Sequence, residues 1–284
     1  MLDSFKIVHL LLVFFIMDFQ NKVIWITGAS SGIGRELALQ LSVQNAKLVL
    51  TARHPETLSQ VCRDAGLNEE NCMLLPADLN NTTDAAEWVK KVMAKFGRID
   101  VLINNAGVSQ RARAADTTTT TDKQLMEVNF MSSLNITKAV LPTMLQQKSG
   151  NIVAISSILG RFGLPLHSTY AAAKHAMLGF FESLHEELKD SGIRVTIICP
   201  GFIKTDVAKN ALTGTGDKYN VQSPAQENGM PANLCAAKIL KATAAGKKIK
   251  YIGKVELLMP VIHHYQPRLF YWLMKKMSKG DSAN

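Results

Sequence analysis

VIWITGASSGIG, residues 23–34, joins a short apolar run to a glycine-rich turn. The β-branched and aromatic run Val23–Thr27 is typical of a buried strand, and a helical pattern begins directly after the turn. In such a unit Gly28 permits the tight turn, Gly32 lets the backbone approach a diphosphate, and Gly34 lets the helix pack closely on the strand. The free N–H groups and the dipole of the helix then face the phosphates. Glycine-rich turns also occur without a ligand. Here, however, a strand precedes the turn and a helix follows it, and this context favours a nucleotide site.

Beyond this unit, short β-rich apolar runs alternate with longer amphipathic segments. The expected strands are Val23–Thr27, Lys47–Ala52, Cys72–Leu75, Val101–Asn104, Asn151–Ile155 and Arg194–Cys199. The expected helices are Ile33–Gln44, Thr57–Ala65, Asp84–Phe96, Asp122–Gln147 and Ser168–Lys189. This alternation predicts a single-domain, three-layer α/β/α fold with a Rossmann-type, doubly wound parallel sheet. Ligands of such a sheet bind beyond the carboxyl ends of its strands, which is where each motif described below lies.

The composition fits one large α/β domain better than two independent ones. Of the 284 residues, 47% are hydrophobic and 19% are charged, so the chain can bury a sizeable core. We expect a catalytic domain at 18–254, an apolar N-terminal extension at 1–17 and a basic, apolar C-terminal extension at 255–284. Cys62, Cys72, Cys199 and Cys235 have no metal-ligand spacing, so we expect reduced, mostly buried thiols in the cytosol and no metal.

The net charge of +9 is concentrated near the C-terminus. Residues 238–284 carry ten Lys and Arg against Glu256 and Asp281, which leaves a net charge of +8 there. Such a tail suits an anionic surface such as a phospholipid face, an anionic substrate, or simply a solvated surface. Nucleic acid is the least favoured partner, because no recognition module accompanies the charge.

Both terminal extensions leave alternatives open. The apolar run Ile7–Met17 has 11 residues and is too short for an ordinary transmembrane helix, which needs about 20. It is either a shallow membrane anchor, or Met17 is the start of the protein. The segment Val255–Met277, interrupted by Pro260 and Pro267, either lies in a bilayer interface, folds over the substrate cleft or packs at a subunit contact. We therefore expect a cytoplasmic protein with a peripheral membrane contact as one alternative.

Arg53 follows the second expected strand, at the end that faces the adenosine ribose in this architecture. An acidic residue there would accept a hydrogen bond from a 2′-hydroxyl, whereas an arginine suits a 2′-phosphate. No Asp or Glu occupies the three positions before Arg53, so NADP(H) is favoured over NAD. The alternative is an arginine that only caps a surface turn.

Tyr170 and Lys174 are spaced to lie on one face of a helix, one turn apart. A free tyrosine has a pKa near 10 and is a poor base at neutral pH. A positive charge about 4 Å away contributes on the order of 4 kcal/mol at an effective dielectric constant of roughly 20. We therefore expect Lys174 to lower the pKa of Tyr170 towards physiological pH. A Tyr-x-x-x-Lys pair is by itself a common accident on a protein surface.

Other polar residues gather at the expected strand ends. Ser156-Ser157 ends one strand and places a hydroxyl where it can hydrogen-bond a carbonyl oxygen, and Asn104–Gly107 ends the preceding strand. Asn129 lies within an expected helix at an apolar position, where its amide needs a polar partner.

From about Lys22 to Gly253 the sequence resembles the short-chain dehydrogenase/reductase family in its single-domain form. The resemblance rests on the glycine motif Thr27–Gly34, on Asn104-Asn105-Ala106-Gly107 and on Tyr170-x-x-x-Lys174. It implies a catalytic tetrad of Asn129, Ser157, Tyr170 and Lys174. It implies cofactor contacts from Gly28, Ser30, Ser31, Gly32, Ile33, Gly34, Arg53, Asp78, Leu79, Asn105, Ala106, Gly107, Tyr170, Lys174, Pro200, Gly201, Ile203 and Thr205.

One position departs from the family pattern. Many members that prefer NADPH carry a basic residue before the second glycine, where this chain has Ser31, so Arg53 must supply most of the selectivity. The stretches around Ser157 and Tyr170 look most similar to the branch that contains acyl/alkyl-dihydroxyacetone-phosphate reductase-like and 11β-hydroxysteroid dehydrogenase-like proteins. The resemblance also implies a small-molecule carbonyl or alcohol substrate and a homodimer.

The sequence thus predicts an NADP(H)-dependent oxidoreductase that interconverts a carbonyl and a secondary alcohol, with a medium-sized or lipid-like ketone as substrate. The alternative is a non-catalytic NADP(H)-binding regulatory protein, a class that usually loses the tyrosine or the lysine. Residues 158–168 and 206–230 are expected to line the substrate pocket, with Thr213–Met230 as a mobile lid.

Overall fold

The computed structural model describes residues 18–281, with side chains described as far as Lys275. The two interpretations of Ile7–Met17 therefore lie outside the described residues. Seven parallel strands form one sheet in the order β3-β2-β1-β4-β5-β6-β9. They are β1 Val23–Thr27, β2 Lys47–Thr51, β3 Cys72–Leu74, β4 Val101–Asn104, β5 Gly150–Ile155, β6 Ile193–Pro200 and β9 Ile249–Ile252. The predicted doubly wound parallel sheet is confirmed, and its order reverses between β1 and β4, where such sheets bind ligands.

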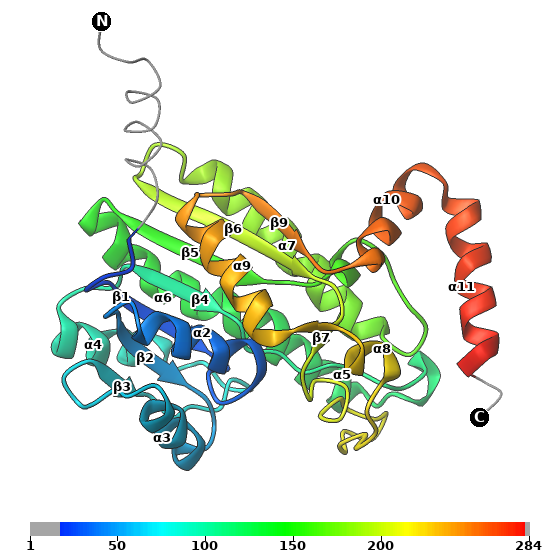
Figure 1. The fold of residues 1–284 in the computed structure, drawn as a ribbon, viewed down its shortest axis with the longest axis horizontal. Coiled ribbons are helices and arrows are strands. Elements are labelled where there is room, and N and C mark those ends of the chain that lie inside the picture. Colours follow the sequence, from blue (N-terminus) through cyan, green and yellow to red (C-terminus); the bar gives the residue numbers. More distant parts are fainter. Residues whose placement is uncertain (1–17, 282–284) are drawn as a thin grey trace, which may run out of the picture.

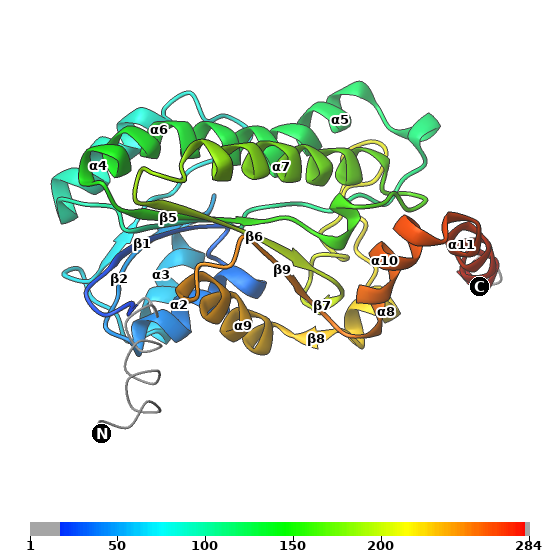
Figure 2. The same cartoon turned by 90° about the horizontal axis from the view of Figure 1, so that it is seen from above.

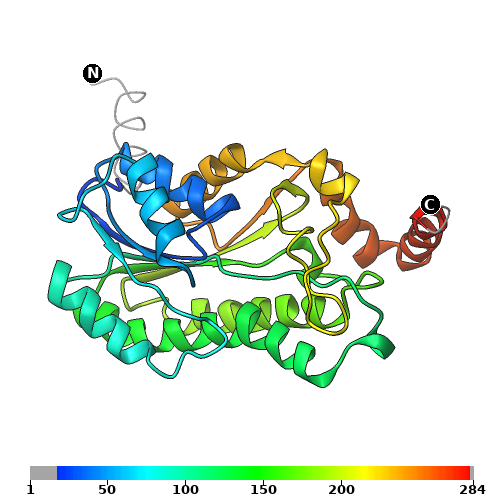
Figure 3. The same cartoon turned by 90° about the horizontal axis from the view of Figure 1, so that it is seen from below.

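Helices cover both faces of the sheet (Figures 2 and 3). One layer holds α4 Ala85–Phe96, α5 Thr119–Met126, α6 Ser132–Gln147 and α7 Ser168–Glu187. The other layer holds α2 Gly32–Ser42, α3 Pro55–Asp64 and α9 Ala232–Ala244. Side chains alternate across the central strand: Ile24 and Ile26 pack towards α2 and α9, whereas Val23 and Trp25 pack towards the other layer. All of β1 is buried, which explains its uninterrupted apolar sequence.

Two parts of the fold differ from the sequence-based expectation. The segment expected as one helix, Asp122–Gln147, consists of α5, a π-helical turn η2 (Glu127–Met131) and α6. The turn arises where the Asn129 side chain takes up backbone hydrogen bonds, and π-helical turns are frequent at functional sites. Strand β9 and helix α9 were not expected. The strand reads Ile-Lys-Tyr-Ile at the sheet edge and has no continuous apolar run to reveal it.

The C-terminal extension leaves the sheet at the end where the strands carry their carboxyl termini (Figures 1 and 2). It consists of a short 3-10 turn η4 (Val255–Leu257), α10 Leu258–Tyr265 and α11 Pro267–Asp281. Pro267 separates the two helices as expected. Pro260 does not interrupt α10, because it lies in the first turn, where a missing N–H costs nothing. In the described part of the chain, no helix is both long and apolar enough to cross a membrane.

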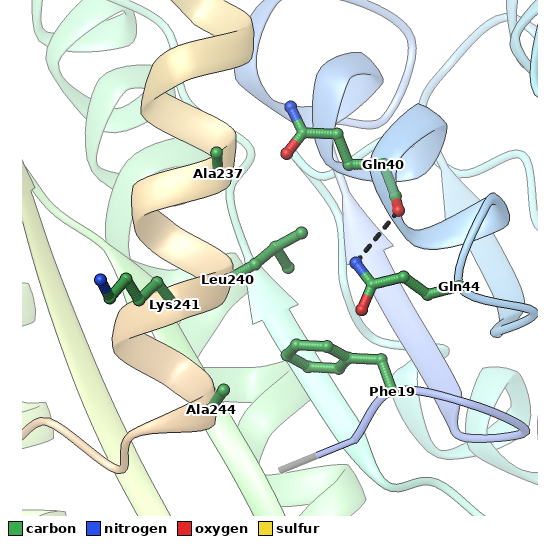
Figure 4. A pocket seen from close by; sticks show the side chains of 7 residues that line it. All are labelled: Phe19, Gln40, Gln44, Ala237, Leu240, Lys241 and Ala244. Carbon is green, nitrogen blue, oxygen red and sulfur yellow. Dashed lines mark hydrogen bonds between the residues drawn. The ribbon is translucent and has the colours of Figure 1, made fainter. Parts of the chain in front are cut away.

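A surface cavity of about 300 Å³ lies between α2 and α9 (Figure 4). Phe19, Gln44 and Leu240 are among the side chains that line it. The helices that form it cover the sheet face opposite to α7, so this cavity is separate from the strand ends where the predicted catalytic residues lie.

Candidate active site

The glycine turn between β1 and α2 has a backbone that only glycine accommodates. Gly28 and Gly32 have φ angles of +65° and +52°. A Cβ atom on Gly28 would lie 2.8 Å from Cα of Ala106, and one on Gly34 would lie 2.2 Å from the carbonyl oxygen of Gly28. The turn therefore packs closely against the end of β4 and against the start of α2. This is the tight turn and close helix packing that the glycines predicted.

Asn105 holds this turn in place from the end of β4. Its Nδ2 donates to the carbonyl oxygens of Thr27 at 3.0 Å and Gly28 at 3.1 Å. In return, Thr27 Oγ1 accepts the N–H groups of Asn105 at 3.0 Å and Ala106 at 3.1 Å. Asn105 was expected at the cofactor, but its amide N–H groups serve to connect two loops of the site.

The N-terminus of α2 suits a diphosphate. Its N-cap residue Ser31 makes no side-chain capping bond, and no acidic residue stands in the first turn. The first-turn N–H groups and the positive end of the helix dipole are thus not neutralised by the helix's own side chains. Thr205 Cγ2 lies 3.1 Å from the position of a Cβ on Gly32, so the predicted nicotinamide segment after β6 reaches the same turn. These features fit a bound dinucleotide.

The predicted adenosine side of the site lies after β2 and β3. Arg53 is exposed directly beyond β2, and within residues 18–281 no ion pair engages it. Arg35, by contrast, is paired with Asp64 at 2.8 Å. Asp78 Oδ1 accepts the backbone N–H of Asn80 at 3.1 Å and its side-chain amide at 2.9 Å. Arg53 is therefore the basic side chain at this edge that remains available for an anionic group.

Tyr170 and Ser157 meet at the carboxyl end of β5. Tyr170 lies in the first turn of α7, and Ser157 begins a 3-10 turn, η3 (Ile158–Gly160). Ser157 lies close enough to the Tyr170 hydroxyl for its side chain to lower the pKa of that phenol, and Ser157 Oγ accepts the N–H of Leu159 at 3.1 Å. The neighbouring hydroxyl of Ser156 donates instead to the carbonyl oxygen of Lys174 at 3.0 Å. Of the two serines, the one at the tyrosine is therefore Ser157.

Lys174 is buried one helical turn beyond Tyr170, with a relative exposure of 3%. Its Nζ donates to the carbonyl oxygen of Ile155 at 3.0 Å and lies 5.8 Å from the centre of the Tyr170 ring. Burial lowers the pKa of Lys174 to about 8. Burial likewise raises the pKa of Tyr170, and the hydrogen bond from Ser157 only partly offsets this.

The expectation that Lys174 lowers the pKa of Tyr170 towards neutrality is wrong for this structure. Such an effect requires an ammonium about 4 Å from the phenol, and the loss of solvation of both groups opposes it. In the structure the ammonium is directed to Ile155, and desolvation is the largest influence on both side chains.

Asn129 lies fully buried on the π-helical turn and connects it to the loop after β4. Its Oδ1 accepts the N–H of Val108 at 3.1 Å, and its Nδ2 donates to the carbonyl oxygens of Val108 and Leu125, both at 2.9 Å. A Cβ on Gly107 would lie 2.8 Å from Asn129 Oδ1 and 3.5 Å from Lys174 Nζ. Three segments far apart in the sequence therefore bring the four predicted tetrad residues to one place.

The comparisons with known proteins agree with this arrangement. A family model described as short chain dehydrogenase matches residues 22–215. The chain belongs to the short-chain dehydrogenase family. It is 38% identical over 273 residues to the human protein "Dehydrogenase/reductase SDR family member 7", covering 94% of this chain and 80% of that one. As a member of this family, it is an oxidoreductase.

Two solved structures of other proteins have a fold similar to that of this dehydrogenase. A short-chain dehydrogenase/reductase from Burkholderia phymatum in complex with NAD has a TM-score of 0.79 and 23% identity, covers 89% of this chain and 96% of its own, and shows the shared fold. A metagenomic short-chain oxidoreductase in complex with NADP has a TM-score of 0.66 and 26% identity, with 83% and 98% covered.

Gln110 is a residue of this dehydrogenase that sequence reasoning missed. It is fully buried, and its Oε1 accepts the N–H groups of Thr169 at 2.9 Å and Tyr170 at 3.2 Å. Its Nε2 donates to Thr117 Oγ1 at 3.2 Å. Gln110 thus satisfies two N–H groups at the start of α7 and holds the backbone of the tyrosine. A glutamine in an irregular loop carries no periodicity or motif that could have indicated this contact.

An apolar cluster forms a wall beside Tyr170. Its buried members are Ile158, Leu159, Phe162, Ala171 and Phe270, and Tyr170 itself packs against them. Phe270 comes from α11, so the C-terminal extension packs against the loop after η3. The segment Thr213–Met230, which was expected to be a mobile lid, is held near its start by hydrogen bonds. The carbonyl oxygen of Gly214 accepts the backbone N–H of Thr118 and the hydroxyl of Thr121.

The depressed pKa of Lys174 predicts a pH-dependent stability effect. Below pH 8 the folded dehydrogenase must bury a charged ammonium, whereas the unfolded chain keeps the ordinary pKa of 10.5. Lys174→Met should therefore raise the free energy of unfolding at pH 7 by roughly 1–3 kcal/mol, and the gain should vanish as the pH rises from about 8 to about 10.5. Denaturant unfolding of both proteins across this range measures the difference, and a gain that is constant with pH would contradict it.

Proposed function

We propose that this protein is an NADP(H)-dependent oxidoreductase that interconverts a carbonyl and a secondary alcohol, with Tyr170 as general acid and base. The observation that carries the proposal is the convergence of Tyr170 and Ser157 at the strand ends, where Lys174 and Asn129 also lie. Two hydroxyl groups in contact can both reach one carbonyl oxygen, which is what proton transfer to that oxygen requires.

The proposed cofactor is a nicotinamide dinucleotide bound along the carboxyl edge of the sheet. The glycine turn and the N-terminus of α2 would hold its diphosphate, and the segment Pro200–Thr205 would face the nicotinamide. Of the two structural neighbours described above, one holds NAD and the other NADP. Exposed Arg53, with no acidic residue at the end of β2, supports NADP(H) in this chain.

In the proposed mechanism the bound reduced nicotinamide supplies the hydride for the carbonyl carbon. Tyr170 donates its hydroxyl proton to the carbonyl oxygen, and Ser157 orients that oxygen by a hydrogen bond. Because burial raises the pKa of Tyr170, the phenol is protonated at neutral pH and serves as the acid for reduction. Lys174 would contact the nicotinamide ribose, while Asn129 would hold a water that links Lys174 to solvent so that the proton can be replaced.

For the substrate we propose a medium-sized or lipid-like ketone, because the wall beside Tyr170 is built from Ile158, Leu159, Phe162 and Phe270. The alternative, a non-catalytic NADP(H)-binding regulator, is less well supported, since all four tetrad residues are present and brought together. We further propose a catalytic domain at 18–254 with the extension 255–284, a homodimer paired through α6 and α7, and a cytosolic location with a peripheral membrane contact.

A panel of aldehydes and ketones tests this proposal. NADPH oxidation is followed by its absorbance, with NADH as the matched cofactor control. We expect turnover of apolar ketones with NADPH and much slower turnover with NADH. Binding of NADPH without turnover of any carbonyl or alcohol on the panel would favour the regulatory alternative.

A further inference from the structure

The helices α10 and α11 present an apolar surface to solvent on the side that does not pack on the protein. On η4 and α10, Val255, Leu258, Val261 and Tyr265 are 76%, 56%, 53% and 72% exposed. Their spacing of three or four residues places them along one stripe. On α11, Leu269, Tyr271 and Trp272 are 45%, 62% and 57% exposed. We name these seven residues the α10–α11 face.

The α10–α11 face is apolar although Phe270 of α11 already packs into the protein. Phe270 is 1% exposed, and its ring centre lies 5.1 Å from that of Phe162. The seven exposed residues lie outside the apolar cluster that contains Phe270. Monomeric proteins rarely leave so many large apolar side chains together in water, and such a surface marks an interaction site.

The charged side chains that α10 and the described part of α11 themselves contribute are all basic. Lys254, Arg268 and Lys275 are exposed beside it, and residues 257–275 contain no Asp or Glu. Glu256, the acid on the preceding turn η4, is buried and accepts the N–H groups of Phe202 and Lys254, both at 3.0 Å. A second copy of this face would bring like charges together, whereas an anionic surface complements it.

We propose that the α10–α11 face docks onto the surface of an anionic phospholipid bilayer. Aliphatic side chains would enter the boundary between headgroups and acyl chains, the tyrosines and Trp272 would lie at the headgroup level, and the basic residues would contact anionic headgroups. No helix of the described residues is suited to crossing the membrane, so the contact is interfacial. Because Phe270 packs in the same apolar cluster as Tyr170, docking would bring the side of the protein that carries the candidate site close to the bilayer.

Tryptophan fluorescence tests the proposal at the face itself. The chain has three tryptophans, and Trp25 and Trp88 are 0% and 7% exposed, so Trp272 alone is open to solvent. When the full-length protein is mixed with phosphatidylcholine/phosphatidylserine vesicles, we expect the Trp272 emission to shift to the blue. Acrylamide quenching should fall at least about threefold, and brominated lipids should quench instead. The Trp272→Phe variant gives the fluorescence of the two buried tryptophans alone, which serves as the baseline.

Paired variants separate the apolar and electrostatic contributions, with co-sedimentation as the readout. Tyr271→Ser and Arg268→Glu should each lower vesicle partitioning by about tenfold. Val43→Ser, at an exposed apolar residue of the opposite end, and Lys91→Glu, at an exposed lysine of α4, should not. Binding should also weaken at high ionic strength and on phosphatidylcholine alone.

Two outcomes would overturn the proposal. One is co-sedimentation that leaves Trp272 open to acrylamide, because another part of the chain then makes the contact. The other is loss of a dimer in solution on Tyr271→Ser without any effect on vesicles, because the face then joins two copies. These measurements need no turnover, so failure of the proposed reaction would leave them interpretable.

Discussion

Tyr170→Phe is expected to lower kcat for carbonyl reduction by about 10²–10⁴-fold, the range that a general acid contributes. The substitution removes one oxygen, and with it the proton that would reach the carbonyl oxygen and the partner of Ser157. The ring, its packing on the apolar wall and the contact of its backbone N–H with Gln110 are retained. The dissociation constant for NADPH should therefore change little.

Steady-state kinetics and a fluorescence titration with NADPH measure these two quantities. Tyr265→Phe is the matched control, because it removes the same oxygen from a tyrosine that is 72% exposed on α10. Since the pKa of Tyr170 is raised, reduction by the wild type should stay constant through neutral pH and should not lose activity by deprotonation of this phenol there. A folded Tyr170→Phe variant with substantial activity would reject the assigned role.

The second large effect is expected at Arg53. Arg53→Glu should lower kcat/KM for NADPH by about 100-fold, because it removes a charge-assisted hydrogen bond worth about 1.5–3 kcal/mol and adds repulsion towards the 2′-phosphate. The value for NADH should stay level or rise, since a carboxylate can accept a hydrogen bond from a 2′-hydroxyl.

The control for this charge reversal is Arg63→Glu. Arg63 is likewise exposed and lies on α3, the helix that follows Arg53, but its guanidinium contacts Gln60 in the same helix. If Arg53→Glu lowered kcat/KM equally for NADPH and NADH, the cause would be a structural defect. An unchanged preference for NADPH would show that another residue recognises the phosphate.

Much of the fold could be predicted because its strands are buried on both faces. A strand such as β1 must be apolar at every position, and the glycines after it are needed for a turn with positive φ angles. Edge strand β9 contains Lys250 and lacks that constraint, so periodicity did not reveal it. Local sequence therefore predicts a strand well where every residue of that strand is buried, and poorly where buried and exposed residues mix.

The site divides in the same way. The sequence by itself determined the parallel sheet, the glycine turn and which residues stand at the strand ends, because all the carboxyl ends of parallel strands lie at one edge of the sheet. The order of the strands came from the tertiary structure. Only the tertiary structure decided that Asn105 connects loops, that Gln110 holds the start of α7 and that Phe270 joins the wall beside Tyr170. It also decided the direction of the pKa shifts of Tyr170 and Lys174, because desolvation depends on everything packed around a side chain. Spacing along a helix does not contain that information.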